Sequence, residues 1–294
     1  MTTLCKAIAR GDVDTVRRLI ARSTGVDEPS ENGYTALLFA SAQGLCEIVS
    51  LLIAAKANIE RPVTLVDGRT PLFIAAELGH LHVVAALIAA HADIDVRDCW
   101  GTTPLGAAAG AGHEDVVDAL LAADASVDVA DCAGATPLHN AAAKGHRGIA
   151  VKLLAANADA RAVNARGATP LHLAAAAGAA DVVDLLQSEK VDVDAIDYRG
   201  ATALCYAAAE NRTACMNRLL APSAAVDGRG AGAPTPLHEA SVSGAADAVR
   251  LLLDRGANPN ERLQGRMRHT TALEACRHAT AAAALLEAGG DPYA

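Results

Sequence analysis

Histidine is the residue type whose number and spacing in this sequence come closest to supporting acid–base or metal chemistry. The 294 residues include ten histidines, and six of them fall into two sets that recur at multiples of 33 residues. Such repetition favours a structural hydrogen-bonding role. A zinc-protease helix needs the spacing HExxH, and neither His238-Glu239 nor His113-Glu114 continues in that way. We therefore predict no metal site. The two sets are His139, His172 and His238, and His80, His113 and His146.

Cysteine and glycine patterns give no support for catalysis or for a cofactor either. The seven cysteines include no C-x-x-C pair, which is typical of reduced thiols. Cys99 and Cys132 are 33 residues apart, and elements stacked about 10 Å apart exceed the disulfide limit of about 7 Å, so we expect exposed free thiols. The Gly-x-Gly-x-Gly run at 228–232 lacks the spacing of a phosphate loop. We predict a protein that is not an enzyme and needs no cofactor.

Composition and charge narrow the class of protein further. Hydrophobic residues make up 52% of the chain but aromatic residues only 2%, so the core must be built from Ala, Leu, Val and Ile. The net charge of −9 argues against nucleic-acid binding, which depends on clustered Lys and Arg. No signal peptide or run of about 18 apolar residues is evident. We expect a monomeric cytoplasmic protein, with the nucleus as the alternative location, that binds neither nucleic acid nor membranes.

A fixed repeat must position all of these residues. The hexapeptide GATPLH occurs at 134–139 and again at 167–172. Its threonine recurs with one step of 35 residues and then five steps of 33 residues, which indicates stacked units of supersecondary structure. The recurring threonines are Thr35, Thr70, Thr103, Thr136, Thr169, Thr202 and Thr235.

The segment 131–160 shows what each part of the repeat does. Gly134 permits a tight turn, Thr136 is placed to cap a helix, and Pro137 occupies the first helical position, where no backbone donor is lost. Gly145 is placed to end that helix, because glycine adopts the left-handed conformation easily. A second helix with larger apolar residues follows. Each repeat is therefore predicted to be a turn followed by a pair of helices.

These motifs resemble a known family. TPLHNA (136–141), TPLHLA (169–174) and TPLHEA (235–240) are similar to the ankyrin repeat signature, which has the same 33-residue period. The resemblance implies an α-helical repeat solenoid in which each unit is a β-hairpin followed by two antiparallel helices, stacked as a curved array. We expect one array over 1–294. Its units are an N-terminal cap at 1–29, repeats at 30–64, 65–97, 98–130, 131–163, 164–196, 197–229 and 230–260, and a C-terminal cap at 261–294.

The sequence departs from the family pattern where the second helix of each repeat ends. Many ankyrin repeats have glycine there, and in this chain only Gly256 keeps it among the full repeats. A left-handed conformation at the other residues would cost about 1 kcal/mol each relative to glycine, and less for Asn and Asp. The replacing residues are Lys56, His91, Asp124, Asn157, Lys190 and Ser223.

The family resemblance also implies where a partner would bind. In ankyrin-like proteins the hairpin tips and the exposed face of the first helix form the binding surface, and three of the seven aromatic residues lie at tips. Tyr, Trp and Arg are frequent hot spots at interfaces. The alternative for Trp100 is that it only covers the neighbouring repeat. The candidate partner-binding residues are Tyr34, Asp67, Arg69, Trp100, Thr102, Arg166, Tyr198 and Arg199.

The sequence therefore predicts a non-enzymatic interaction scaffold or adaptor that binds another protein. The alternative is a regulatory or inhibitory subunit, or an assembly chaperone, that masks a partner's surface. Resemblance to ankyrin-type kinase inhibitors and proteasome-assembly chaperones allows that alternative.

Overall fold

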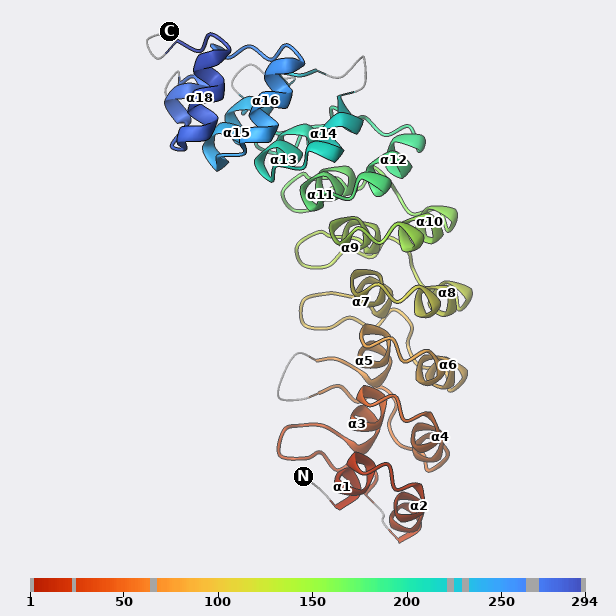
Figure 1. The fold of residues 1–294 in the computed structure, drawn as a ribbon. Coiled ribbons are helices and arrows are strands. Elements are labelled where there is room, and N and C mark those ends of the chain that lie inside the picture. The colour runs from red at the N-terminus through yellow and green to blue at the C-terminus, as the bar shows by residue number, and fades with distance from the viewer. Residues whose placement is uncertain are drawn as a thin grey trace. The chain divides into compact units, whose positions relative to one another are not determined.

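The computed structural model of the chain describes residues 3–22, 25–63, 68–220, 225–228, 233–262 and 270–291. Over these ranges the regular structure is α-helical, and the helices follow one another in pairs. Between pairs the chain makes an excursion with a tight turn at its tip, which we call a finger (Figure 1). The fingers lie where the sequence predicted β-hairpins. Within the described residues their strand pairing amounts to one isolated antiparallel bridge, between Ile196 and Thr202.

The recurring threonine begins the first helix of each pair, as the sequence predicted. The hydroxyl of Thr35 accepts a hydrogen bond from the backbone N–H of Leu38 at 3.3 Å, and that of Thr103 accepts one from Gly106 at 3.2 Å. Pro104 then occupies the first turn. Each cap satisfies a backbone donor that the helix leaves without a partner.

The residue at the glycine position is left-handed at each described end of a second helix in the full repeats. Gly256 has φ of 87°, and the residues that replace glycine have φ between 55° and 65°. These residues adopt a conformation that costs about 1 kcal/mol or more for a side chain with a Cβ. Ser223, at the same position of its repeat, lies outside the described residues. The left-handed residues that replace glycine are Lys56, His91, Asp124, Asn157 and Lys190.

The chain divides into two compact units, Met1–Pro137 with Lys152–Ala158, and Leu138–Val151 with Asp159–Ala294. In the first unit the odd-numbered helices pack in one row and the even-numbered helices in a second row (Figure 1). The fingers project from the odd-numbered row, away from the even-numbered row. The helices are α1 (Thr3–Ala9), α2 (Val13–Arg22), α3 (Ala36–Ala42), α4 (Cys46–Ala54), α5 (Pro71–Glu77), α6 (Leu81–Ala89), α7 (Pro104–Ala111) and α8 (Glu114–Ala122).

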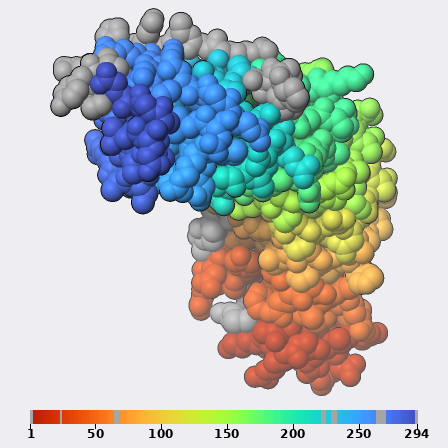
Figure 2. Space-filling view, turned by 45° about the horizontal axis from the view of Figure 1, so that its top comes forward, coloured from red at the N-terminus to blue at the C-terminus, as the bar shows by residue number. Residues whose placement is uncertain are grey.

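The second unit repeats the two-row arrangement, and Figure 2 shows its helices from α13 (cyan) to α18 (blue) as one continuous surface. The boundary between the units falls within α9 (Pro137–Lys144) and α10 (Arg147–Ala155). The other helices are α11 (Pro170–Ala177), α12 (Ala180–Ser188), α13 (Ala203–Ala209), α14 (Thr213–Leu219), α15 (Pro236–Ser243), α16 (Ala246–Asp254), α17 (Ala272–Ala275) and α18 (Ala279–Glu287).

Small aliphatic residues fill the core between the rows, and histidines link successive repeats. Leu72, Val84 and Leu105 are at most 1% exposed. The Nε2–H of His172 donates to the carbonyl of Ala201 at 3.1 Å, in the next repeat. Equivalent bonds confirm the structural role predicted for both sets of histidines. They join His139 to Ala168, His238 to Thr270, His80 to Ala42 and His113 to Glu77.

The described helices have between 4 and 10 residues. None in the described part of the chain has the length and apolar character that a membrane span requires.

Candidate functional site

The fingers at 98–102, 131–135, 164–168 and 197–201 are each shaped by one polar side chain that turns inward at the base. In the first unit, Asp98 is 8% exposed, and its Oδ1 accepts hydrogen bonds from the backbone N–H groups of Trp100 at 3.0 Å and Thr102 at 2.8 Å. The backbone N–H of Asp98 donates to the carbonyl of Thr102 at 3.1 Å. These bonds close the turn, so the position of the Trp100 backbone is fixed by the fold.

The side chain of Trp100 meets residues from the preceding repeat. The guanidinium carbon of Arg69 lies 5.6 Å from the centroid of the Trp100 ring and 5.3 Å from that of Phe73. Glu77 on α5 holds the other side of this guanidinium, with an Nη1–Oε2 distance of 2.7 Å. Trp100 is nevertheless 52% exposed, whereas Phe73 is buried. We call these four residues the Trp100 cluster.

The ordering of the Trp100 cluster rests on several modest interactions. A cation–π contact contributes about 0.5–2 kcal/mol, depending on how far it is desolvated. The Arg69 and Glu77 side chains are 27% and 32% exposed, so their ion pair is only partly screened by water. Their charges cancel within the cluster. The face that Trp100 leaves to solvent is therefore apolar in character.

Neighbouring fingers of the first unit are joined to one another near Trp100. The backbone N–H of Cys132 donates to the carbonyl of Trp100 at 2.8 Å. Arg97 bonds to the carbonyl of Gly101 through Nε at 3.0 Å, and its Nη2 bonds to the carbonyl of Ala130 on the next finger. Cys99 and Cys132 are both exposed at these tips.

Tyr34, another predicted site residue of the first unit, has a different set of neighbours from Trp100. Tyr34 packs against a small core cluster of Leu38, Val63 and Ile74. Asp67 lies outside the described residues. Of the four predicted residues that are described in this unit, the structure brings Arg69, Trp100 and Thr102 together.

The second unit has a different constellation around Asp197, which is 3% exposed. Its Oδ1 accepts from the backbone N–H groups of Arg199 and Ala201, both at 2.8 Å. Its Oδ2 accepts from the Tyr206 hydroxyl at 3.0 Å and from Arg199 Nε at 3.3 Å. The guanidinium carbon of Arg199 also lies 5.9 Å from the Tyr206 ring centroid. Asp197 therefore organises both the finger and the adjacent helix α13.

The electrostatics of this constellation follow from burial and hydrogen bonding. Burial alone would raise the pKa of Asp197, but the donors from Ala201, Arg199 and Tyr206 hold that pKa below its usual value. Burial, followed by the hydrogen bond to Asp197, raises the pKa of Tyr206. Burial also raises the pKa of Glu239 on α15, and the positive charge of Arg199 partly offsets that rise. The cluster is an ion-pair network in which Asp197 is held by Arg199 and by the Tyr206 hydroxyl.

Arg166 and Tyr198 occupy neighbouring fingertips in the second unit. The backbone N–H of Tyr198 donates to the carbonyl of Arg166 at 3.0 Å. Tyr198 is 76% exposed, and Arg166 is also exposed. The structure therefore brings together Arg166, Tyr198 and Arg199 from the predicted set.

Sequence reasoning missed Tyr206 and Glu239, which lie on the exposed face of α13 and α15. Both are the fourth residue after the capping threonine of their repeat, at Thr202 and Thr235. The fourth residue after the threonine lies about one helical turn along the helix, on the face next to the fingers. The position of Tyr206 and Glu239 in the repeat would therefore have identified them.

The described residues offer little of what catalysis or metal binding requires. No group of three or more His, Cys, Asp or Glu side chains within them is arranged to hold a metal ion. The thiol of Cys205 is buried, which raises its pKa to about 11 and makes the thiolate scarce at neutral pH.

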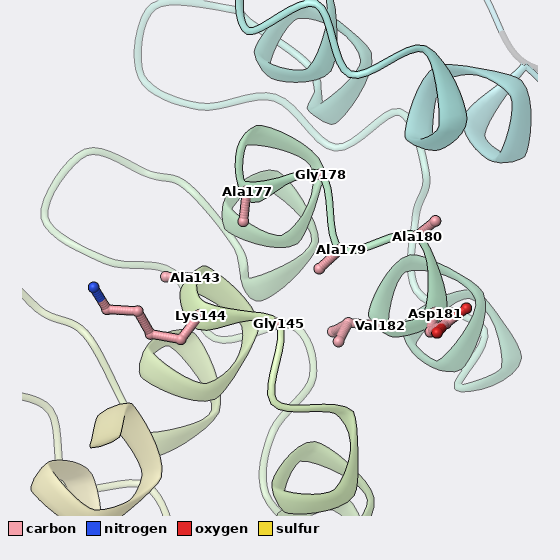
Figure 3. A pocket seen from close by; sticks show the side chains of 9 residues that line it. All are labelled: Ala143, Lys144, Gly145, Ala177, Gly178, Ala179, Ala180, Asp181 and Val182. Carbon is pink, nitrogen blue, oxygen red and sulfur yellow. The ribbon is translucent and has the colours of Figure 1, made fainter. Parts of the chain in front are cut away.

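A depression of about 500 Å³ lies between the turn after α9 and the turn that joins α11 to α12 (Figure 3). Alanine and glycine line most of it. The charged side chains of Lys144 and Asp181 point away from each other in Figure 3. Small-molecule sites usually have polar groups that converge on the ligand, and this depression lacks them.

The repeated pairs of helices, the fingers and the histidine bonds recur with the period of the sequence. Family models described as "Ankyrin repeats (3 copies)" match residues 55–131, 72–163, 123–197 and 189–263, and one described as "Ankyrin repeats (many copies)" matches residues 4–53. The chain belongs to the ankyrin repeat family. Ankyrin repeats are protein–protein interaction modules.

A solved structure supports the same assignment. The crystal structure of the human ASB11 ankyrin repeat domain is 30% identical in sequence to this ankyrin repeat protein, with a TM-score of 0.68. The match covers 76% of this chain and 100% of that one. No curated protein sequence matches the chain.

Proposed function

We propose that this ankyrin repeat protein is a non-enzymatic adaptor that binds a partner protein through its fingers and the exposed faces of its odd-numbered helices. Trp100 is the principal anchor. Large aromatic side chains and arginine contribute most of the binding energy at many interfaces. The residues proposed to contact a partner are Tyr34, Asp67, Arg69, Trp100, Thr102, Arg166, Tyr198 and Arg199.

The observation that carries this proposal is the way in which Trp100 is held. Its ring is half exposed, yet Arg69 lies against one side of it and Glu77 fixes Arg69. Asp98 fixes the backbone of the same residue. A side chain that is ordered before binding loses little conformational entropy when a partner covers it. A partner that covers such a ring therefore gains the favourable free energy of apolar burial at a small entropic cost.

Leu78 extends the apolar area available to a partner. It is 47% exposed and follows Glu77 as the C-terminal cap residue of α5. Because Arg69 and Glu77 neutralise each other, the partner need not supply a charge at this point. The anchor site is therefore suited to an apolar side chain of the partner.

The test is affinity purification with mass spectrometry from the native source, using the wild-type protein and Trp100→Ala. We expect Trp100→Ala to weaken the captured partner by more than about 1 kcal/mol, which is about fivefold in Kd, while the melting curve stays nearly unchanged. Leu286→Ala is the matched control, because Leu286 on α18 is 53% exposed but lies far along the chain from the anchor.

Two results would contradict the proposal. One is a capture profile that Trp100→Ala leaves unaltered. The other is a loss of thermal stability in Trp100→Ala as large as its loss of binding, because Trp100 would then serve only to cover the neighbouring repeat.

A further inference from the structure

We propose that two neighbouring fingers of the second unit form a separate docking surface for an acidic, apolar segment of a partner protein. This surface, the finger patch, consists of Val163, Ala165, Arg166, Ile196, Tyr198 and Arg199. The inference rests on the proposed function in taking the fingers as binding elements. It goes further by joining Arg166, Tyr198 and Arg199, which are among the proposed contact residues, with exposed apolar neighbours, and by naming the chemistry of the partner.

Exposed apolar side chains recur at equivalent positions of these two fingers. On each finger the inward-turned polar residue, Asn164 or Asp197, is flanked by exposed apolar residues. Val163 and Ile196 are each 52% exposed, and Tyr198 is 76% exposed. Single exposed apolar residues are ordinary, but a contiguous set on adjoining elements marks an interaction site.

The described fingers at 98–102 and 131–135 in the first unit differ at the first of these positions. The position of Val163 and Ile196 is occupied there by Arg97 and Ala130. Arg97 is engaged with carbonyl groups of its own finger and of the next one. The finger patch is therefore a property of particular side chains in the second unit, since the fold alone does not require it.

Tyr198 is held in place although it is exposed. A Cβ atom added to Gly167 would lie 2.7 Å from Cδ1 of Tyr198 and 2.8 Å from its backbone nitrogen. The ring therefore lies directly on the backbone of the preceding finger, where only glycine leaves room for it. Like Trp100, Tyr198 presents a preorganised aromatic surface.

The charges at the two tips favour a partner with carboxylates. Arg166 is exposed, and its guanidinium makes no hydrogen bond or ion pair with the described residues. Arg199 is paired with Asp197, but its side chain remains 65% exposed. Asp197 is buried and accepts four hydrogen bonds, so it presents little charge outward. Arginine forms bidentate hydrogen bonds with carboxylates, which adds geometric specificity.

Glu239 is the acidic group that limits how much negative charge the patch can accept. It lies on α15, is half-buried, and interacts electrostatically with Arg199. Arg166 is thus the cation that remains available, and Arg199 supports it. A segment with a few carboxylates among apolar residues fits this arrangement. A continuous polyanion such as nucleic acid would be repelled by the net charge of −9.

The test uses fluorescein-labelled peptides and fluorescence anisotropy with the full-length protein. One peptide alternates Leu and Glu around a central Phe, a second has Lys in place of Glu, and a short polythymidine strand represents nucleic acid. We expect the Glu peptide to bind saturably and at least about tenfold more tightly than either of the others. Arg166→Glu and Tyr198→Ala should each weaken the Glu peptide by about tenfold or more.

Two matched variants separate the patch from general effects. Arg250→Glu makes the same charge change on α16, where Arg250 is exposed and pairs only with Asp247 among the described residues. Trp100→Ala removes the anchor of the proposed function in the first unit. We expect both variants to bind the Glu peptide within about twofold of the wild type, because neither alters the patch.

Several outcomes would overturn the finger patch. They are an absence of saturable binding by the Glu peptide, equal or tighter binding of the Lys peptide or the polythymidine strand, and an equal loss in Arg250→Glu. If Trp100→Ala loses the native partner while the Glu peptide fails to bind, the patch is wrong and the proposed function stands. If the peptide binds at the patch but Trp100→Ala changes no captured protein, the anchor is wrong and the patch stands.

Discussion

Trp100 is the single tryptophan of the chain, so its fluorescence reports on the anchor site alone. The indole is held by a guanidinium that is itself held by a carboxylate, and this order of dependence makes Glu77 a positioning residue. Among the described residues, Arg69 lies against two aromatic rings and pairs with the carboxylate of Glu77, so removing that carboxylate takes away one of its restraints.

We expect Glu77→Gln to increase the motion of Trp100 without unfolding the protein. Acrylamide quenching of the tryptophan should rise and its fluorescence anisotropy should fall, while the free energy of unfolding changes by less than about 1 kcal/mol. Glu47→Gln serves as the control, because its pair with Arg17 is exposed and lies on the even-numbered helices. Unchanged quenching in Glu77→Gln would show that Trp100 does not depend on the ion pair.

The buried histidines of the second unit make stability depend on pH. In His172, Nδ1 accepts the backbone N–H of Thr169 at 3.1 Å while Nε2–H donates to Ala201, so protonation of Nδ1 would set two donors against each other. Burial lowers the pKa of both His172 and His238. The unfolded chain therefore binds more protons than the folded one below the usual histidine pKa of about 6.5, and stability falls as pH decreases through that value.

We expect the free energy of unfolding, measured in urea, to decrease between pH 7.5 and pH 5.5, values chosen to lie about one unit on either side of that pKa. The decrease should be smaller in His172→Gln and His238→Gln, although each variant should lose about 1 kcal/mol at the higher pH because a buried hydrogen bond is altered. A decrease that is equal in the variants and the wild type would assign the pH dependence to other groups.

At the scale of the elements, non-glycine residues at the ends of the second helices have a strained backbone conformation that glycine would adopt more easily. Lys56 and Lys190 adopt φ of 65° and 55°, and both side chains are exposed. The left-handed conformation costs a residue with a Cβ about 1–2 kcal/mol, while glycine pays about 0.5–1 kcal/mol more than alanine in backbone entropy.

Because the strain of a left-handed lysine is larger than the entropic cost of glycine, we expect Lys56→Gly and Lys190→Gly each to raise the free energy of unfolding, by up to about 1 kcal/mol. Urea denaturation with an unchanged m-value would measure the gain. The reverse substitution Gly256→Lys should lower stability by a similar amount, since Gly256 has φ of 87°. Loss of stability in both lysine variants would show that their side chains contribute packing that outweighs the strain.

In the fingers, the residues that close the turn are different from the residues that face solvent and are available for binding. In the fingers at 98–102, 131–135, 164–168 and 197–201 the inward residue is Asp or Asn, and its side-chain oxygen closes the turn, as in Asp98 and Asp197. The residues beside it face solvent and carry no such requirement. This division allows Trp100 and Tyr198 to occupy the fingertips at no cost to the turn.

At the scale of the whole molecule, the chain presents two kinds of docking chemistry on two compact units. The Trp100 cluster belongs to the first unit and is apolar with its charges cancelled, whereas the finger patch belongs to the second and has an uncancelled arginine. An adaptor needs surfaces that can be occupied by different partners. Because the two surfaces share no residue, substitutions in one should leave binding at the other intact.

The sequence by itself determined the architecture of this protein. The 33-residue period, the capping threonine with its proline, and the histidines in register each act over a few residues or between adjacent repeats. Such local rules can be read without coordinates because glycine, proline and threonine favour the same backbone conformations wherever the motif occurs. The sequence also identified Lys56 and His91 as replacements of the family's glycine, and both are left-handed in the structure.

Only the tertiary structure decided which side chains meet. Arg69 touches Trp100, 31 residues further on, and Tyr206 donates to Asp197 on the finger before its helix. The period places these residues on neighbouring elements but does not specify the rotamers that bring their side chains together. A fingertip residue is under no constraint from the repeat, so its contacts depend on the particular side chains that the adjoining repeats supply.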